Sequence, residues 1–326
     1  MADASLPEHD AIAAANGDDE SDDLAVDERT ASVGEAQHGE RLDKAIVAFV
    51  PEFSRSHLQQ LIRAGEVSAD GAPATSPAQR VRAGQRITVR LQPTAESRAY
   101  RGEVLPLAVV HEDRHILVVD KAAGMVVHPA AGNWSGTLLN ALLARDPASA
   151  GLPRAGIVHR LDKDTSGLMV VGRTLAAVTA LVRAIAARQV QRRYLAIAHG
   201  SPPRDRWSVD APIGRDPRVR TRMTVLASGK AARTDFERLA AREGVAALRC
   251  TLHSGRTHQI RVHLAHAGMP LVGDQLYGGA PALGLDRQAL HADELAFAHP
   301  VSGEPLAFRS EPPSDFAHGW RQVVAA

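Results

Sequence analysis

Cysteine is nearly absent from this 326-residue chain, which contains only Cys250. A single thiol excludes an intrachain disulfide, and it leaves no cysteine pair for a structural zinc site. Long apolar runs are also missing, since no stretch approaches the roughly 20 apolar residues that a membrane helix needs. The N-terminus lacks a basic region followed by an apolar run, which argues against a secretory signal. We therefore expect a cytoplasmic protein without a membrane anchor.

Basic residues are almost missing from the start of the chain. Residues 1–37 contain eleven Asp or Glu and one basic residue, Arg29, which gives 1 − 11 = −10. The whole chain has a formal charge of +1, so the remainder carries +1 − (−10) = +11. An acidic segment without aromatics cannot bury enough apolar surface to fold, so we predict a disordered acidic tail over residues 1–37. The basic remainder has the charge expected of a nucleic-acid binder, a property that many other proteins share.

The length and the 44% apolar content suit about two globular domains. The first predicted domain spans residues 38–92. Apolar residues recur at helical spacing over residues 42–49 and again over residues 54–65. A turn and alternating apolar residues over residues 67–91 then predict a small sheet.

This first domain resembles the S4 RNA-binding domain. The resemblance rests on Gly-Glu-Arg-Leu-Asp at residues 39–43, Ser-Arg-Ser at 54–56 and Leu-Ile-Arg-Ala-Gly-Glu-Val at 61–67. It implies that the helical face binds structured RNA and that Arg41, Arg55 and Arg63 contact phosphates. The alternative for any one of these arginines is an ordinary solvated position.

A turn-rich stretch at residues 93–103 predicts a linker, and residues 104–326 form the second domain. Near its start, residues 111–115 match the His-Glu-x-x-His zinc signature. That signature needs one continuous helix, whereas the β-branched runs on both sides predict a hairpin with the histidines at its turn. We therefore assign no metal to this motif.

The segment 156–172 places two carboxylates among two cations between apolar runs. The runs at 157–158 and 168–171 predict strand ends, so the polar residues between them form a loop projected from a sheet. Asp162 is the candidate reactive carboxylate of this loop. A salt-bridged hairpin loop without catalytic function is the alternative.

A helix is predicted within residues 255–268, with Gly268 placed to end it. Arginines stand at the start of this helix, where the helix dipole is positive and disfavours a cation. Such an arrangement indicates an anionic partner nearby. Its histidines do not have the i, i+4 spacing of a helical zinc pair, so no metal site is predicted here either.

Both stretches resemble blocks of the RluA family of pseudouridine synthases. Residues 159–168, 255–263 and 271–274 match the hallmark blocks of that family. Residues 127–133 and 286–292, together with the S4 domain, are most similar to its RluD-type branch, which modifies large-subunit ribosomal RNA. One departure is Asp120-Lys121-Ala122, where the family usually has Asn-Lys-Pro, and it puts the rigidity of this loop in question.

The resemblance implies an α+β fold, in which a catalytic domain built on a mostly antiparallel mixed sheet follows a small S4 domain. It also implies a reaction that breaks the uridine N1–C1′ bond, turns the base and joins C5 to C1′ without a cofactor. In this family an essential aspartate matches Asp162, and its arginine partner matches Arg261. The sequence leaves open whether the carboxylate attacks the sugar or helps to move a proton there.

Further roles follow from the same resemblance. Tyr194 matches the tyrosine that stacks on the target base and assists proton removal from C5. Arg160 resembles the arginine that occupies the space left by a flipped nucleotide. His159 and Arg256, from the same blocks, are assigned to RNA binding.

The expected partner is ribosomal RNA or an immature large ribosomal subunit, bound by a monomer, with helix 69 of 23S ribosomal RNA as the target. Another ribosomal RNA site or transfer RNA is the alternative. A non-catalytic S4 protein would leave the catalytic blocks unexplained. An aspartyl-phosphate phosphotransferase needs its paired aspartates after a long hydrophobic strand, which is missing before Asp162, and a glycosidase needs carboxylates on opposite faces of the bond.

Overall fold

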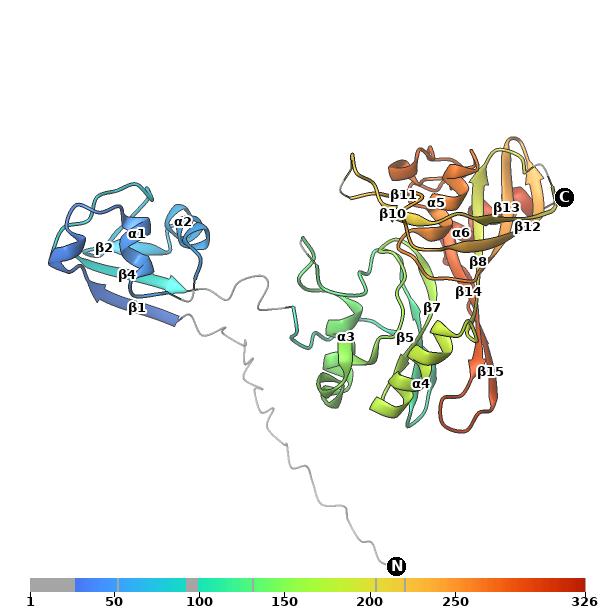
Figure 1. The fold of residues 1–326 in the computed structure, drawn as a ribbon, viewed down its shortest axis with the longest axis horizontal. Coiled ribbons are helices and arrows are strands. Elements are labelled where there is room, and N and C mark those ends of the chain that lie inside the picture. The colour runs from blue at the N-terminus through green and yellow to red at the C-terminus, as the bar shows by residue number, and fades with distance from the viewer. Residues whose placement is uncertain are drawn as a thin grey trace, which may run out of the picture. The chain divides into compact units, whose positions relative to one another are not determined.

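The computed structural model describes residues 27–51, 53–91, 99–130, 132–202, 204–219 and 221–325. The chain divides into two compact units, Met1–Thr94 and Ala95–Ala326, and each is described by itself (Figure 1). No helix in the described ranges is both long and apolar enough to cross a membrane.

The N-terminal unit is a four-stranded antiparallel sheet with two short helices. The strand order is β1-β4-β2-β3. The elements are β1 (Asp27–Ser32), a 3-10 helix (Glu35–Gln37), α1 (Leu42–Val47), α2 (Arg55–Arg63), β2 (Val67–Ala69), β3 (Ala72–Pro73) and β4 (Arg86–Leu91). Ser54 caps α2 by accepting a hydrogen bond from the His57 amide at 3.3 Å, which matches the predicted second helix.

The predicted disordered tail is wrong for residues 27–37. All six residues of β1 pair with β4, and Thr30 and Thr88 hydrogen-bond across the two strands at 2.9 Å. Val33 follows the strand and is buried in the core of the unit. An edge strand obtains its stability from backbone hydrogen bonds and one anchoring side chain, so composition did not reveal it. Residues 1–26 of the predicted tail lie outside the described residues.

Two truncations test this boundary. Removing residues 1–37 should lower the melting temperature of the N-terminal unit, because it strips the β1 pairing partner from β4 and takes Val33 from the core. Removing residues 1–26 leaves β1 and Val33 in place and should change little. Amide hydrogen exchange in β4 provides the measurement, and equal protection in the two truncated proteins would contradict the assignment of β1.

The C-terminal unit is built on a nine-stranded sheet in the order β5-β6-β7-β14-β8-β13-β12-β9, with β15 paired to β14. Its strands are β5 (Ala108–Glu112), β6 (Ile116–Lys121), β7 (Ser166–Gly172), β8 (Gln191–His199), β9 (Arg206–Asp210), β12 (Arg233–Arg242), β13 (Val245–Leu252), β14 (Leu290–Ala298) and β15 (Pro305–Arg309). Of these pairings only β7 with β14 is parallel. The predicted mostly antiparallel α+β fold is confirmed.

Helices cover both faces of this sheet (Figure 1). On one face, α3 (Leu138–Arg145) and α5 (Gln259–His266) pack in a core with Leu248. On the other, α4 (Leu175–Ala186) packs on β6 and β7, and α6 (Ser314–Val324) packs on β8 and β13. Since the face with α3 and α5 also carries the segments 156–165 and 253–258, the candidate site lies there.

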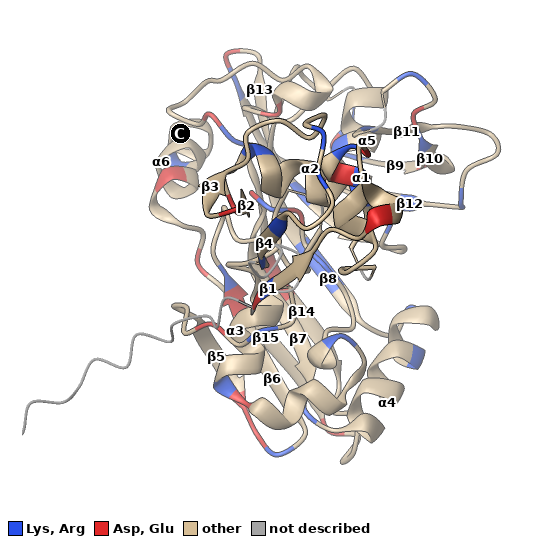
Figure 2. Cartoon of the chain, turned by 90° about the vertical axis from the view of Figure 1, so that its left-hand side faces the viewer, with Lys and Arg blue, Asp and Glu red and all other residues tan. Residues whose placement is uncertain are grey.

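Smaller elements fill the connections of the C-terminal unit. They are the 3-10 helices Pro147–Gly151, Pro153–Gly156 and Gln275–Tyr277, and a separate hairpin of β10 (Ile213–Arg215) and β11 (Met223–Val225). The hairpin and its turn carry Arg215, Arg218 and Arg222, and Figure 2 shows these basic segments in blue.

The predicted hairpin at the His-Glu-x-x-His motif is confirmed. His111 lies on β5 and His115 lies just before β6, and the two strands are antiparallel. Asp113 shapes the turn, since its Oδ1 accepts the amides of His115 and Ile116 at 2.6 and 2.8 Å. A zinc site of the helical type is therefore excluded at this motif.

The predicted linker is wrong for residues 99–103, which pack within the C-terminal unit. The Asn140 side chain donates to the carbonyls of Ala99 and Arg101, at 3.3 and 2.7 Å. Gly102 lies against the backbone of Ala144 so closely that a Cβ would stand 2.9 Å from its nitrogen. Turn-forming residues suggested a linker, but here they permit close packing. The segment 92–98 lies outside the described residues.

Candidate active site

The loop that carries Asp162 is fastened to its neighbours by a buried lysine. Ile157 makes an isolated bridge to Val171, and β7 begins at Ser166, so the predicted projecting loop is present although no strand precedes it. Lys121 Nζ donates to the carbonyls of Ala122, Met125 and Lys163, at 2.8, 2.9 and 2.9 Å. These bonds hold the loop at residues 120–122, whose rigidity the sequence had put in question.

Asp162 faces the guanidinium of Arg261 across the pocket. Arg261 Nη1 donates to Asp162 Oδ2 at 3.1 Å, while its Nε and Nη2 donate to the two carboxylate oxygens of Asp274, both at 2.8 Å. The Asp274 side chain is 1% exposed and that of Arg261 is 7% exposed. The predicted anionic partner of the arginines at this helix start is thus found in two carboxylates, those of Asp162 and Asp274.

The protonation of Arg261 is secured by these neighbours. Burial alone lowers the pKa of a guanidinium, but the hydrogen bonds that Arg261 donates to Asp274 and the charge of Asp162 outweigh it and raise the pKa of Arg261 above its usual value. A permanent cation therefore stands beside Asp162. A carboxylate held in this way is suited to nucleophilic attack or to proton transfer.

Tyr277 and His258 complete this end of the site, and no role was predicted for either from the sequence. The Tyr277 ring lies under two guanidinium groups, with Arg261 Cζ at 5.0 Å and Arg222 Cζ at 5.3 Å from its centroid. Its hydroxyl accepts from the Met223 amide and bonds His258 Nδ1 at 2.8 Å. His258 Nε2 lies 3.9 Å from Asp162 Oδ1.

Tyr194 lies on β8 within the same pocket, which has a volume of about 800 Å³. Burial raises the pKa of Tyr194 to about 12, so the phenol is neutral at physiological pH. Asp162, Tyr194 and Arg261 all line the pocket, and the structure therefore brings together the three residues predicted to act in catalysis.

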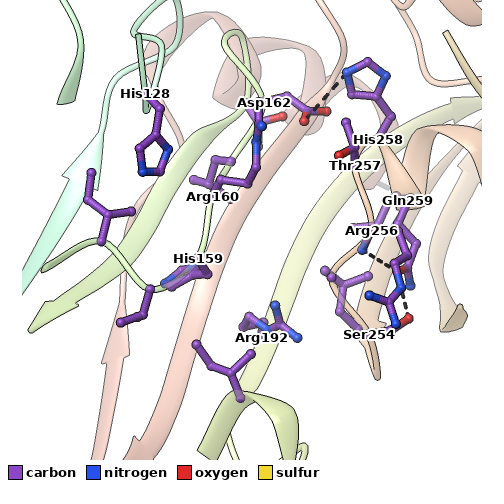
Figure 3. A pocket seen from close by; sticks show the side chains of 18 of the residues that line it. His128, His159, Arg160, Asp162, Arg192, Ser254, Arg256, Thr257, His258 and Gln259 are labelled. Atoms are coloured by element: carbon purple, nitrogen blue, oxygen red, sulfur yellow. Dashed lines mark hydrogen bonds and ion pairs between the residues drawn. The ribbon is translucent and has the colours of Figure 1, made fainter. Parts of the chain in front are cut away.

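Arg160 and Arg256 lie at the edge of the pocket, where Figure 3 shows their side chains. Both are exposed. Arg256 Nε donates to the Ala231 carbonyl at 3.2 Å, and its amide donates to the Gln259 side chain at 3.0 Å. The exposed guanidinium groups are accessible to RNA phosphates.

His159 is tied to the sheet through one ring nitrogen. Its Nε2 accepts a hydrogen bond from the Val170 amide at 3.0 Å. Burial, with a smaller effect of the Arg192 charge, lowers the pKa of His159 to about 3, so the ring is neutral. Because Nε2 accepts, the neutral ring carries its proton on Nδ1, which is buried and has no partner among the described residues.

This histidine predicts a pH dependence of stability. Its folded pKa lies below the usual 6.5, so between about pH 3 and pH 6.5 the unfolded chain binds more protons, and stability falls as pH falls through that window. His159→Asn should reduce the slope of unfolding free energy against pH by up to about 1.4 kcal/mol per unit. Denaturant unfolding at pH 5, 6 and 7 measures it. Parallel slopes for both proteins would show that His159 titrates normally.

The S4 arginines divide into two kinds. Arg41 and Arg55 both donate to Asp43, whose side chain is fully buried, at 3.0 to 3.1 Å. The bond from Arg41, followed by the bonds from Gln59 and Arg55, holds the pKa of Asp43 well below its usual range. Arg63 is exposed at the end of α2, and within the described ranges no ion pair engages it. Arg63 therefore has all its donors available.

The chain has recognisable relatives among known proteins. A family profile described as RNA pseudouridylate synthase matches residues 115–266, and one described as S4 domain matches residues 40–87. Over 312 residues the chain is 47% identical to Ribosomal large subunit pseudouridine synthase D of Xanthomonas campestris pv. campestris, covering 91% of this chain and 93% of that protein. The chain belongs to the RNA pseudouridylate synthase family.

Other relatives agree. The protein of the same name from Nitrosomonas europaea is 47% identical over 287 residues, 86% of this chain and 83% of that protein. The solved structure Human RNA Pseudouridylate Synthase Domain Containing 1 has a TM-score of 0.51 and 29% identity, over 65% of this chain and 86% of that one. Human RNA Pseudouridylate Synthase Domain Containing 4 has a similar fold, with a TM-score of 0.53, 22% identity and coverage of 67% and 93%.

Membership of the RNA pseudouridylate synthase family makes this protein an isomerase and confirms the predicted enzyme class. The predicted S4 domain is confirmed by its own profile match. Sequence reasoning missed Lys121 and Tyr277 as site residues, and it assigned no role to Asp274. Asp274 did fall within the hallmark block at residues 271–274, and that block was the available signal.

Proposed function

We propose that this pseudouridine synthase modifies uridines of large-subunit ribosomal RNA, with the stem-loop helix 69 as its target. The names of its relatives support the large subunit as substrate. A hairpin loop suits the pocket because its bases are partly unstacked, and extrusion from a loop costs less than extrusion from a duplex. In this proposal the protein acts on ribosomal RNA in the cytoplasm, as a monomer.

The observation that carries the catalytic proposal is the ion pair between Asp162 and Arg261 inside a pocket of about 800 Å³. In our proposal Asp162 acts at the sugar of the extruded uridine, either by attacking C1′ or by moving a proton. The N1–C1′ bond breaks and the detached uracil turns. C5 then bonds to C1′ as the Asp162 carboxylate leaves C1′ or, in the proton-transfer route, returns the proton that it took from the sugar. Loss of the C5 proton and protonation of N1 complete the isomerisation.

Tyr194 supplies the base-stacking surface in this proposal. With a pKa of about 12 its phenol is a poor proton acceptor before substrate binds, so stacking is its main contribution. Arg160, exposed at the pocket edge, fills the space that the extruded nucleotide leaves. Arg261 keeps Asp162 oriented through their hydrogen bond.

The target is tested by incubating the protein separately with unmodified large-subunit RNA, immature large subunits and transfer RNA. Pseudouridine is then located chemically in each RNA. We expect product in the helix 69 loop, and we expect that modification to be missing from ribosomal RNA of cells without the gene. Product confined to transfer RNA, or to another ribosomal site, would overturn the target and leave the enzyme class intact.

The S4 unit is proposed to position the enzyme through phosphate contacts. Arg63→Gln should weaken binding of structured RNA and reduce the slope of log K against log salt by about 1, because one fewer counterion is released. Arg90→Gln is the matched control, since that arginine is already ion-paired with Glu28 at 3.2 Å. Fluorescence titrations at several salt concentrations give both slopes. A slope unchanged by Arg63→Gln would remove that residue from the RNA interface.

A further inference from the structure

Arg192 is a buried guanidinium inside the catalytic pocket, and nothing in the reaction described above uses it. It lies on β8 two residues before Tyr194, and strand alternation puts both side chains on the pocket face. The residue is 7% exposed. Its neighbour Arg193 points to the opposite face, where it pairs with Glu294 at 3.0 Å.

The charge of Arg192 has no partner in the part of the chain that the structure describes. Across the described residues, no hydrogen bond or ion pair engages its side chain, and its Nε is buried without a partner. A buried cation without an anion is strongly unfavourable, so such a group is normally paired in the functional state of a protein. Every other arginine or lysine that is buried in the described ranges has partners: Arg261 holds two carboxylates and Lys121 three carbonyls.

The surroundings of Arg192 are shaped to hold its guanidinium against the pocket wall. Gly255 lies so close that a Cβ there would stand 2.9 Å from Arg192 Nη1. His159 lies in the same pocket, in the part of it that also holds Arg192 (Figure 3), and among the described residues its Nδ1–H has no acceptor. Both groups are hydrogen-bond donors, and neither has an acceptor within the ranges that the structure describes.

The position of Arg192 identifies the kind of anion that it receives. Figure 3 shows Asp162 and His258 at one end of the pocket and Arg192 at the other, with Arg160 and His159 between. In the proposed reaction the sugar of the target uridine lies next to Asp162. A group bound by Arg192, at the other end of the pocket, therefore lies away from the reacting carbon. A phosphodiester of the RNA backbone has the required charge, and an arginine fork matches its oxygens.

We propose that Arg192, assisted by the Nδ1–H of His159, binds a phosphodiester next to the target uridine and so holds the flipped nucleotide in register with Asp162. This inference rests on the proposed role of the pocket as the nucleotide-binding site. Arg192 is a positioning residue and contacts no reacting atom.

The test combines protein variants with RNA whose backbone charge is removed at one position. Synthetic hairpins carry a neutral methylphosphonate on the 5′ or the 3′ side of the target uridine, and the adjacent 2′-hydroxyl is methylated in test and control RNA alike. Wild-type, Arg192→Met and Arg192→Lys proteins are compared for kcat, KM and Kd. Arg193→Met is the matched control on the opposite face of the same strand.

For the wild-type protein, one neutral linkage should lower kcat/KM by about tenfold or more, the usual loss for a charge-assisted hydrogen bond. On the ordinary hairpin, the Arg192→Met protein should show a similar loss of kcat/KM. On the hairpin with the same neutral linkage, its kcat/KM should fall almost no further. Arg192→Lys should recover part of the activity, and Arg193→Met should behave as wild type. Equal sensitivity of wild-type and Arg192→Met proteins to both neutral linkages would overturn the proposal.

A second variant guards against misfolding of Arg192→Met. Gly255→Ala keeps the charge and pushes a methyl group against Arg192 Nη1, so it should reduce sensitivity to the same neutral linkage. Undiminished sensitivity in Gly255→Ala would count against the proposed geometry. If the wild-type protein converts a different RNA, the same comparison is made on that RNA. If an RNA is bound but not converted, the same comparison of proteins and linkages is made with binding constants. The role of Arg192 is thereby tested even where the proposed target is wrong.

Discussion

Asp162→Asn will abolish pseudouridine formation, with turnover reduced by about 10³-fold or more, the scale seen when a reacting side chain is removed from an enzyme. The amide keeps the shape of the carboxylate but cannot attack C1′ or accept a proton there. RNA affinity should stay within a few-fold of wild type, because the substitution removes one charge and few contacts. Single-turnover assays on ribosomal RNA, with binding measured in parallel, separate the two effects.

Asp164→Asn is the matched control for this experiment. Asp164 lies in the same loop two residues further on, and its backbone carbonyl accepts from Arg287 at 2.9 Å, a bond that the substitution keeps. We expect the Asp164→Asn protein to retain activity. A folded Asp162→Asn protein that turned over at a rate comparable to Asp164→Asn would remove Asp162 from the chemistry.

Arg261→Met will cost both activity and stability. It leaves Asp274, buried to 1% exposure, as an uncompensated charge, and breaking a buried ion pair in this way typically costs about 3–5 kcal/mol of unfolding free energy. Activity falls because Asp162 loses the cation that orients it. All three tryptophans, Trp134, Trp207 and Trp320, lie in the C-terminal unit, so tryptophan fluorescence during denaturation reports on this unit alone.

A double variant separates the loss of stability from the loss of activity. Arg261→Met with Asp274→Asn removes the stranded charge and should regain part of the stability, while activity stays lost because Asp162 still has no partner. Recovery of turnover in the double variant would mean that Asp274, and not Asp162, is the functionally important partner of Arg261. An Arg261→Met protein as stable as wild type would contradict the buried network itself.

Local patterns predicted the elements that depend on neighbouring residues. Ser54 at a helix start and the β-branched runs on both sides of residues 111–115 were sufficient for a capped helix and a hairpin. The joint site of Asp162 and Arg261 was expected from family resemblance, because their 99-residue separation contains no local signal of contact. Tyr277 shows the same limitation, since its role follows from stacking under Arg222 and Arg261.

The wrong predictions concern segments whose structure depends on distant residues and not on their neighbours in the sequence. The strand at residues 27–32 and the segment 99–103 are poor in apolar residues, and both are ordered through backbone hydrogen bonds to distant partners. Composition measures the apolar area available for burial and is insensitive to such pairing. Lys121 escaped notice for a related reason, because a lysine is expected at the surface and its burial depends on three carbonyls brought together by the fold.

The sheet order has a consequence for synthesis of the protein on the ribosome. Strand β14 lies between β7 and β8, although it is made after both of them. Until residues 290–298 have left the ribosome, the segment bearing Asp162 and the strand bearing Tyr194 have no common strand to align them. A nascent chain therefore contains every residue of the proposed chemistry before it has an assembled pocket. Such late, long-range closure is slow and leaves strand edges exposed, so the enzyme becomes active only once its C-terminal region has folded.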